Sequence, residues 1–386
     1  MTADTLYVEG SPALKKAKLS GPTGAMHDSM KPGLGDIMGS ATVEPPVDLP
    51  SLDTFSPLQR TVLFANGNLQ RILSSYHDSP VTVTVRFNRR KAHGSYEREV
   101  DLSVFGCIFA VCTSSVVLTT EECIRAIEVD GVGIGQLFRH LNIMPAFSLL
   151  QAGQLAAAAE ESPTTSGPQA LDSEARFWRE YQLSGLGVQC TIREVLRSDL
   201  FELRPAISTE ASQSSAVAQS SGFGDLMSGT VTSMLLPSGF SPKQRILITA
   251  NGNVERLLSS YYNSPVTTCV MLNNRRSESD VYDRQIAMLV DGRQLMLAKS
   301  TIFLTDPAWQ KICEDENVPV GSMFHRMGVL PTFTLHHAGV GPQYFWRVYQ
   351  LKSSGMTCEI NETFSIDVFT DADSRPEKPQ LEGHGF

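Results

Sequence analysis

The chain has 386 residues, of which 41% are hydrophobic and 19% are charged, and its formal net charge is −9. This composition is typical of a globular protein with room for two ordinary domains, and it excludes a largely disordered chain. The acidic balance, without long runs of Lys or Arg, argues against a nucleic-acid-binding protein, which normally carries a basic patch.

The seven cysteines form no C-x-x-C pair, and their odd number indicates buried thiols in a reducing compartment. The first residues, M-T-A-D-T-L-Y-V-E-G, lack the basic and apolar regions of a signal peptide. No apolar run approaches the roughly 20 residues that a membrane helix needs. We therefore expect a cytoplasmic protein that contacts neither membrane nor nucleic acid.

Low-complexity stretches divide the chain into two bodies. Residues 1–54 are rich in Gly, Pro and Ser without periodicity, which predicts a disordered tail. The range 205–239 contains I-S-T-E-A-S-Q-S-S-A-V-A-Q-S-S-G and predicts a flexible linker, while the polar residues 372–386 predict a C-terminal tail. Two domains are expected between them, at 55–204 and 240–371.

The first body begins with a helix and continues mainly with strands. Asn66 or Asn68 of A-N-G-N is expected to cap the helix L-Q-R-I-L-S-S-Y. The alternating V-T-V-T-V-R-F predicts a half-buried strand, and the next two strands are expected to form a hairpin around Gly106. A short helix, I-G-Q-L-F-R-H-L, precedes the strands W-R-E-Y-Q-L and G-V-Q-C-T-I-R-E-V-L. This order indicates an α+β domain with a mostly antiparallel sheet and a few helices.

The second body repeats the first. A-N-G-N-L-Q-R-I-L-S-S-Y returns as A-N-G-N-V-E-R-L-L-S-S-Y, and F-W-R-E-Y-Q-L returns as F-W-R-V-Y-Q-L. Gly106 corresponds to Gly292 of a V-D-G-R hairpin turn. The first copy also has an insertion after Leu155, A-A-A-A-E-E-S-P-T-T-S-G-P, which is predicted to be a surface loop. The chain is thus a tandem duplication, and its two domains are expected to pack on each other.

Several motifs of both halves are similar to those of a known family. The motifs are R-E-V-D-L from Arg98, R-Q-I-A-M from Arg284, an Asp-Gly hairpin in the second half, and a strand of the form G-x-x-x-x-x-x-E that reaches Glu194 and Glu362. Each half thereby resembles the chorismate lyase (chorismate–pyruvate lyase) family, whose fold superfamily also includes ligand-sensing domains of bacterial regulators. The family enzyme usually has one such domain. This chain departs from that pattern, because the duplication predicts two tandem chorismate lyase-like domains.

The resemblance implies a role for these residues. In the lyase family the Arg of the first motif binds the ring carboxylate, which implies that Arg98 and Arg284 bind substrate through two parallel hydrogen bonds. The Glu of the last strand lies at the opposite end of the pocket, which implies that Glu194 and Glu362 are catalytic and move a proton. The further substrate-binding residues expected from the matched turns are Asn68, Asn253, Ile134 and Val320. No metal or cofactor is expected, because aromatisation drives the loss of enolpyruvate.

Two classes of function remain open at this point. The first is a cofactor-independent enzyme that acts on a small cyclic or aromatic carboxylate or a hydroxylated ring. Its narrowest form converts chorismate into 4-hydroxybenzoate and pyruvate, and its broader form is a lyase, dehydratase or cyclase of secondary metabolism. The second is a module without catalysis, either a sensor or carrier of aromatic acids or a scaffold. The sequence leaves open whether one or both halves work.

Two other pairs of residues recur in the duplicated halves. Arg71 and Arg256 lie on the first helix of each half, where an amphipathic pattern predicts a solvated position. Trp178 and Trp346 anchor the F-W-R motifs, and they are expected to pack in the core rather than to line a pocket.

Overall fold

The computed structural model describes residues 51–132, 137–155, 175–205, 231–232, 236–277, 279–314 and 320–370. All of them lie in one compact unit, Gly33–Phe386. Residues 51–54 of the predicted N-terminal tail are described and include the 3-10 turn Leu52–Thr54. The rest of that tail, the C-terminal tail, the insertion after Leu155 and the candidate residue Ile134 lie outside the described residues. Among the described residues, no helix is long and apolar enough to cross a membrane.

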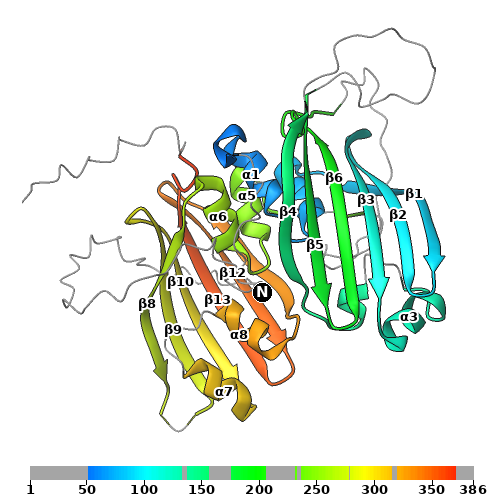
Figure 1. Cartoon of the computed structure of the whole chain (residues 1–386). Coiled ribbons are helices and arrows are strands. Elements are labelled where there is room, and N and C mark those ends of the chain that lie inside the picture. The colour runs from blue at the N-terminus through cyan, green and yellow to red at the C-terminus, as the bar shows by residue number, and fades with distance from the viewer. Residues whose placement is uncertain are drawn as a thin grey trace, which may run out of the picture. The chain divides into compact units, whose positions relative to one another are not determined.

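The first half alternates pairs of helices with groups of three strands (Figure 1). After a short 3-10 turn, its helices are α1 (Pro57–Leu63), α2 (Leu69–His77), α3 (Glu121–Glu128) and α4 (Leu137–His140). Its long strands are β1 (Val81–Ala92), β2 (Ser95–Val104), β3 (Cys107–Leu118), β4 (Ala146–Leu155), β5 (Arg176–Gly185) and β6 (Val188–Arg197).

The second half repeats this order element by element. Its helices are α5 (Pro242–Thr249), α6 (Val254–Tyr262), α7 (Pro307–Cys313) and α8 (Val320–Met327). Its strands are β8 (Val266–Arg275), β9 (Val281–Val290), β10 (Arg293–Leu304), β11 (Thr332–Val340), β12 (Tyr344–Ser353) and β13 (Met356–Ser365). The duplication seen in the sequence is therefore a duplication of structure.

Both sheets are antiparallel and have the same topology. The strand order is β4-β5-β6-β3-β2-β1 in the first half and β11-β12-β13-β10-β9-β8 in the second. The prediction of two similar α+β halves with antiparallel sheets is confirmed. In the first half a short strand, β7 (Val231–Thr232), extends the sheet by pairing with the start of β1. These two residues come from the range in which the sequence predicted a flexible linker.

Tight turns fix the register of the central hairpins, as the sequence predicted. Asp291 and Gly292 join β9 to β10 with φ angles of 49° and 79°. Phe105 and Gly106 join β2 to β3 with φ angles of 55° and 79°. Positive φ at both central residues is the type I′ geometry that matches the twist of a hairpin, and Gly tolerates it without steric cost.

Helices α1 and α5 were not predicted from the sequence, although both have strong start signals. Ser56 accepts a hydrogen bond from the backbone of Gln59, whose side chain bonds back to the backbone of Ser56, and Ser241 and Gln244 repeat this capping box. Proline occupies the first turn in both cases. Such reciprocal bonds satisfy backbone donors that a helix start otherwise leaves unpaired.

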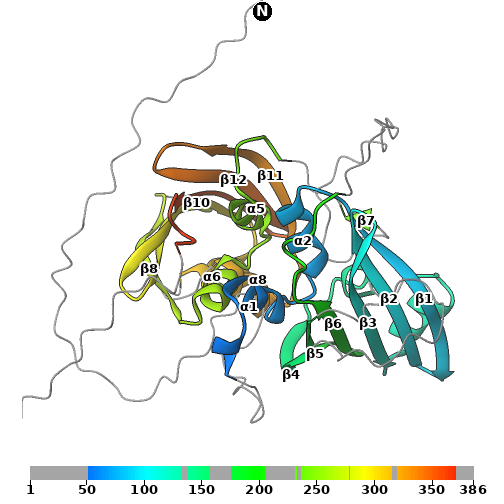
Figure 2. The same cartoon turned by 90° about the horizontal axis from the view of Figure 1, so that it is seen from above.

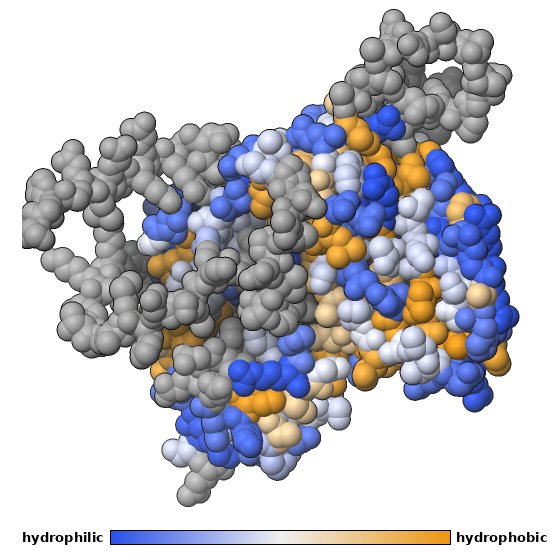
Figure 3. Space-filling view, viewed as in Figure 1, coloured by the Kyte–Doolittle hydropathy of each residue, from blue (hydrophilic) through white to orange (hydrophobic). Residues whose placement is uncertain are grey.

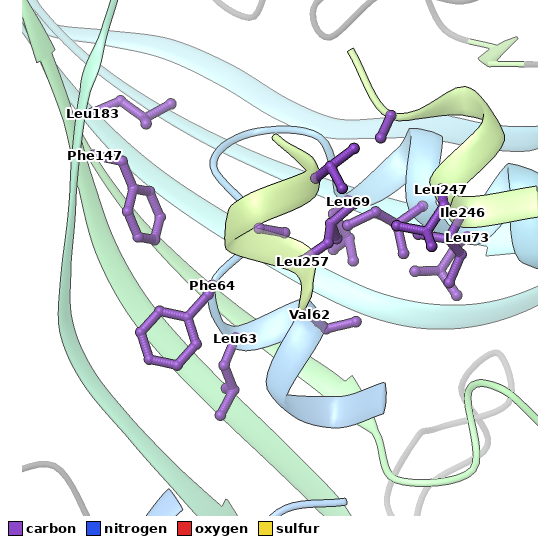
Figure 4. Packing of buried hydrophobic residues seen from close by; sticks show 14 of the residues in the cluster. Val62, Leu63, Phe64, Leu69, Leu73, Phe147, Leu183, Ile246, Leu247 and Leu257 are labelled. Atoms are coloured by element: carbon purple, nitrogen blue, oxygen red, sulfur yellow. The ribbon is translucent and has the colours of Figure 1, made fainter. Parts of the chain in front are cut away.

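Helices α5, α6 and α8 of the second half lie on one face of its sheet (Figure 2). In Figure 2 the strands curve around α5, α6 and α8, which lie on the concave side. Figure 4 shows leucines of α2 packed among Ile246 and Leu247 of α5, with Leu257 of α6 beside them, in one cluster of buried residues. On the face drawn in Figure 3, hydrophobic residues lie in patches between hydrophilic ones. The concave face is therefore where apolar surface is buried.

Buried arginines donate hydrogen bonds from each half to the other. Arg71 donates to the carbonyl oxygen of Thr249 at 3.1 Å, and Arg256 donates to that of Phe64 at 3.3 Å. Arg60 of α1 donates to carbonyl oxygens at the end of α6 at 3.0 and 2.8 Å. Because Arg71 and Arg256 are only 3% and 7% exposed, the prediction of a solvated position is wrong for both. The polar side of each helix meets the other half instead of water.

Candidate functional site

A cavity of about 60 Å³ lies between the helices and the sheet of the second half. Roughly 10–15 Å³ of such volume holds one water, so the cavity accommodates several waters. Its walls come from the starts of α6 and α8 and from strands β9, β10, β12 and β13. The lining residues are Gly252, Val254, Glu255, Arg284, Ile286, Met288, Ala298, Ser300, Val320, Gly321, Tyr349, Leu351, Ile360 and Glu362.

Arg284 of β9 is the unusual residue of this cavity. It is 2% exposed, and none of its three guanidinium nitrogens has a hydrogen-bond partner among the described residues. Side chains alternate along a strand, so Arg284 shares its face with Ile286 and Met288, which line the same cavity. Burial lowers the pKa of the Arg284 guanidinium. A buried cation without a partner is costly, and an anion in the cavity would remove that cost.

Glu362, at another wall of the cavity, is already fully engaged. Its Oε2 accepts a hydrogen bond from Nε of Arg347 at 2.7 Å, and Nη2 of Arg347 lies 2.7 Å from the same oxygen. Its Oε1 accepts a hydrogen bond from the hydroxyl of Tyr349 at 2.8 Å. Arg347 also donates to the carbonyl oxygens of Ile248 and Ala250 at the end of α5. The network therefore fixes two strands to a helix end.

The first half contains the same network. Nε of Arg179 donates to Glu194 at 2.7 Å, and the hydroxyl of Tyr181 donates to the other oxygen of Glu194 at 2.9 Å. Nη1 of Arg179 donates to the carbonyl oxygens of Leu63 and Ala65 at 3.1 and 2.6 Å. Burial raises the pKa of the Tyr181 hydroxyl well above its usual value, so it stays a donor. The buried carboxylates of Glu194 and Glu362 are thus each held by an Arg and a Tyr in the same arrangement.

Sequence reasoning missed the arginine and tyrosine of these networks. A signal was present, because R-x-Y recurs in F-W-R-E-Y-Q-L and F-W-R-V-Y-Q-L. Residues two apart on a strand face the same side, so both side chains reach the Glu of the neighbouring strand. The predicted site pairs are not part of this network: among the described residues, Arg98 makes no hydrogen bond or ion pair with Glu194, nor Arg284 with Glu362, and none was predicted between groups at opposite ends of a pocket. Arg284 and Glu362 do line one cavity.

The other predicted binding residues have varied positions. Val320 lines the cavity at the start of α8. Asn68 and Asn253 are each 2% exposed at the N-cap positions of α2 and α6, but neither side chain caps its helix. Oδ1 of both residues is buried without a hydrogen-bond partner among the described residues. Asn253 itself is not in the cavity wall, although both its chain neighbours are. Arg98 is partly exposed.

Glu255 is a cavity residue that the sequence reasoning did not single out. It lies in the first turn of α6 and is partly buried. Burial raises the pKa of its carboxyl to about 7. Gln70 takes the corresponding place in the first half, in N-L-Q-R against N-V-E-R. The change from Gln70 to Glu255 within this repeated motif is the signal by which sequence reasoning could have found the residue.

The two tryptophans are not core residues, so that prediction is wrong. Trp178 and Trp346 are partly exposed on the strand face opposite their buried neighbours. Each ring covers a glycine of the next strand: a Cβ at Gly153 would lie 2.7 Å from Trp178, and one at Gly339 would lie 2.8 Å from Trp346. Both halves therefore repeat the same contact, in which an indole ring packs against a glycine on the outer face of the sheet.

A second, larger hollow of about 440 Å³ borders the other face of the second sheet. Besides Arg284, its charged lining residues are Asp283, Lys299 and Glu359, which have mixed signs and are each partly or fully exposed. We therefore assign the candidate site to the buried cavity, where Arg284 meets apolar walls.

The described residues contain no group of three or more His, Cys, Asp or Glu side chains that could hold a metal ion. No protein-family model matches the chain, and no curated protein matches it.

Proposed function

We propose that the protein is a cofactor-independent enzyme that binds a small cyclic or aromatic carboxylate in the cavity of its second half. The observation that carries the proposal is Arg284, which is buried in the cavity wall with all three nitrogens unpaired among the described residues. A guanidinium presents two parallel donors that match the geometry of a carboxylate. Such a pair gains strength where the protein shields it from bulk water.

The remaining walls suit a ring. Ile286, Met288 and Leu351 supply apolar surface, while Ser300 adds a hydroxyl close to Arg284 in the sheet, since the two residues are register partners. Mostly apolar walls with a few polar groups are the common lining of a ligand site. The ligand class is therefore a compact ring that carries one carboxylate.

The narrowest form of the activity is conversion of chorismate into 4-hydroxybenzoate and pyruvate. It is supported by the motif resemblance around Arg284 and Glu362, both of which line the cavity. The reaction needs no electron acceptor or metal, because a ring proton and an enolpyruvyl group leave the substrate and an aromatic ring results. A broader form is a lyase, dehydratase or cyclase of secondary metabolism that acts on a related ring.

One observation favours a second candidate, a sensor or carrier that binds aromatic acids without turnover. Both oxygens of Glu362 already accept hydrogen bonds from Arg347 and Tyr349. A carboxylate held in this way is a poor proton carrier, since moving a proton would break an established network. Binding and turnover use the same residue types, so the two candidates are separated by experiment.

The test is incubation of the purified protein with chorismate, followed by detection of 4-hydroxybenzoate and pyruvate. We expect both products in equal amounts from the wild type and a strong loss in the Arg284→Met variant. The Arg98→Met variant controls for the first half. If the wild type binds 4-hydroxybenzoate through Arg284 but forms no product, the carrier function replaces the enzyme. If it does neither, both candidates fail.

A further inference from the structure

We propose that Glu255 is the proton-exchanging residue of the second-half cavity, and that Gln70 in its place leaves the first half without proton transfer. The inference rests on the proposed function and adds a division of labour between the halves. It begins from three features: the position of Glu255 in the cavity wall, the absence of a partner for it among the described residues, and the comparison with the first half.

The position of Glu255 suits contact with a bound ring. It follows Gly252 and Val254, which also line the cavity, at the start of α6. Among the described residues its carboxyl makes no hydrogen bond or ion pair, in contrast to Glu362, whose two oxygens are both occupied. Of the two carboxyls in the cavity, Glu255 is the one whose proton can move without dismantling a structural network.

The charged and titratable groups around Glu255 come from several elements. Arg284 of β9, Tyr349 of β12 and Glu362 of β13 line the same cavity, whereas the lining residues of β10 and α8 do not titrate. Helix α1 contributes Arg60, whose guanidinium contacts the opposite end of α6. Arg284 is thus the cation of the cavity wall that a ligand carboxylate and Glu255 would share.

Two opposing effects keep both states of Glu255 accessible near neutral pH. Burial disfavours the ionised carboxyl and raises its pKa to about 7. The start of a helix favours a negative charge, so the ionised form is still supported. A group with a pKa near the working pH is the most effective general acid or base.

The comparison of the two halves distinguishes Glu255 from the other polar residues of the cavity wall. The polar lining residues of the second cavity recur in the first half as follows: Arg284 as Arg98, Ser300 as Ser114, Tyr349 as Tyr181 and Glu362 as Glu194. Glu255 alone among these polar positions changes its chemistry, to Gln70. An amide has nearly the shape of a carboxyl but cannot exchange a proton in this pH range. The first half therefore keeps the binding groups and lacks the acid–base group.

For chorismate, the step balances as follows. The ionised Glu255 takes the proton from the ring carbon that bears the hydroxyl, and the C–H electrons form a ring double bond. The neighbouring ring C–O bond breaks, and its electrons leave with enolpyruvate. Glu255 then gives the proton to the methylene carbon of enolpyruvate, which yields pyruvate and restores the carboxylate. No oxidant, reductant or further reactant is needed.

The test compares the wild type with Glu255→Gln, and with Glu255→Gln/Gln70→Glu as the matched swap. Binding of 4-hydroxybenzoate is measured by calorimetry between pH 5.5 and 8.5, and chorismate turnover over the same range. In the wild type we expect affinity to fall as pH rises through about 7, because ionised Glu255 repels the ligand carboxylate. In Glu255→Gln we expect retained binding without this inflection and turnover reduced by about 100-fold or more. The swap should regain part of the turnover.

The outcomes separate this inference from the proposed function. If the wild type binds no aromatic carboxylate, the proposed function fails and this inference fails with it. If binding depends on Arg284 but Glu255→Gln keeps both the wild-type pH profile and the wild-type turnover, only the role of Glu255 is overturned. A protein that binds but never turns over still tests the inference, through the presence or loss of the inflection in affinity.

Discussion

Arg347 holds Glu362 through two nitrogens that each lie 2.7 Å from one carboxylate oxygen. The same strand-to-strand relationship recurs between Arg179 and Glu194 in the first half. Arg284, by contrast, lines the same cavity as Glu362 with no partner among the described residues. The second sheet therefore contains two buried arginines in opposite environments: Arg347 is paired with a carboxylate, and Arg284 has no partner among the described residues.

Replacement of Arg347 by Met should destabilise the protein strongly. The change leaves the Glu362 carboxylate buried without its cation, which typically costs about 3–5 kcal/mol. Urea unfolding followed by circular dichroism measures the loss. The double variant Arg347→Met/Glu362→Leu is the control, since it removes both charges and should regain a large part of the stability. A single variant as stable as the wild type would contradict the structural role.

Replacement of Arg284 by Met should have the opposite effect on stability. It removes a buried cation that has no partner in the unliganded protein, so we expect the free energy of unfolding to rise by about 1 kcal/mol or more. The gain should come with loss of any thermal stabilisation by 4-hydroxybenzoate. Thermal melts with and without ligand measure both effects. A loss of stability similar to that of Arg347→Met would mean that Arg284 supports the fold.

Glu255 should make the stability depend on pH. Its pKa rises from 4.5 in the unfolded chain to about 7 in the folded protein, because burial disfavours the ionised carboxyl. Between these values the folded state holds the proton more tightly, so stability falls as pH rises from about 4.5 to about 7 and then levels off. Glu255→Gln removes this loss, and should be more stable than the wild type at pH 8 by up to about 3 kcal/mol. Equal differences at pH 4.5 and 8 would contradict the burial of the carboxyl.

Arg60 should matter more for stability than its duplicate, Arg245. Arg60 donates to the carbonyl oxygens of Phe55, Ser260 and Tyr261, two of which belong to the other half. Arg245 is more exposed: it donates to the carbonyl oxygen of Phe240 at 3.3 Å and forms an ion pair with the exposed side chain of Asp78. Charged hydrogen bonds contribute about 1.5–3 kcal/mol each, so Arg60→Ala should cost at least that much and Arg245→Ala less. Unfolding curves with similar midpoints for both variants would refute the difference.

Features encoded locally were predictable from the sequence. The alternation in β1 and the Asp291-Gly292 turn carry their own signals, because strand faces and turn angles depend on neighbouring residues. The duplication also made Arg284 and Glu362 stand out as a recurring pair, and both line the cavity.

Features that depend on distant partners were not predictable. Arg347 bonds carbonyl oxygens at the end of α5, about a hundred residues earlier in the chain. The sequence of its helix predicted a solvated position for Arg71, because the hydrogen-bond acceptor, Thr249, lies in the other half. Burial of Glu255 likewise comes from strands and helices far along the chain. These environments exist only once the halves have folded.

The most direct test is titration calorimetry of 4-hydroxybenzoate into the Arg98→Met variant, in which Arg284 is the only one of the two predicted carboxylate-binding arginines that remains. The amide analogue, 4-hydroxybenzamide, controls for binding of the ring alone. We predict that the carboxylate binds, that the amide binds at least about tenfold more weakly, and that Arg98→Met/Arg284→Met loses roughly 10–150-fold in affinity for the carboxylate. Equal carboxylate affinity in the single and double variants would contradict the assignment of this cavity as a carboxylate site.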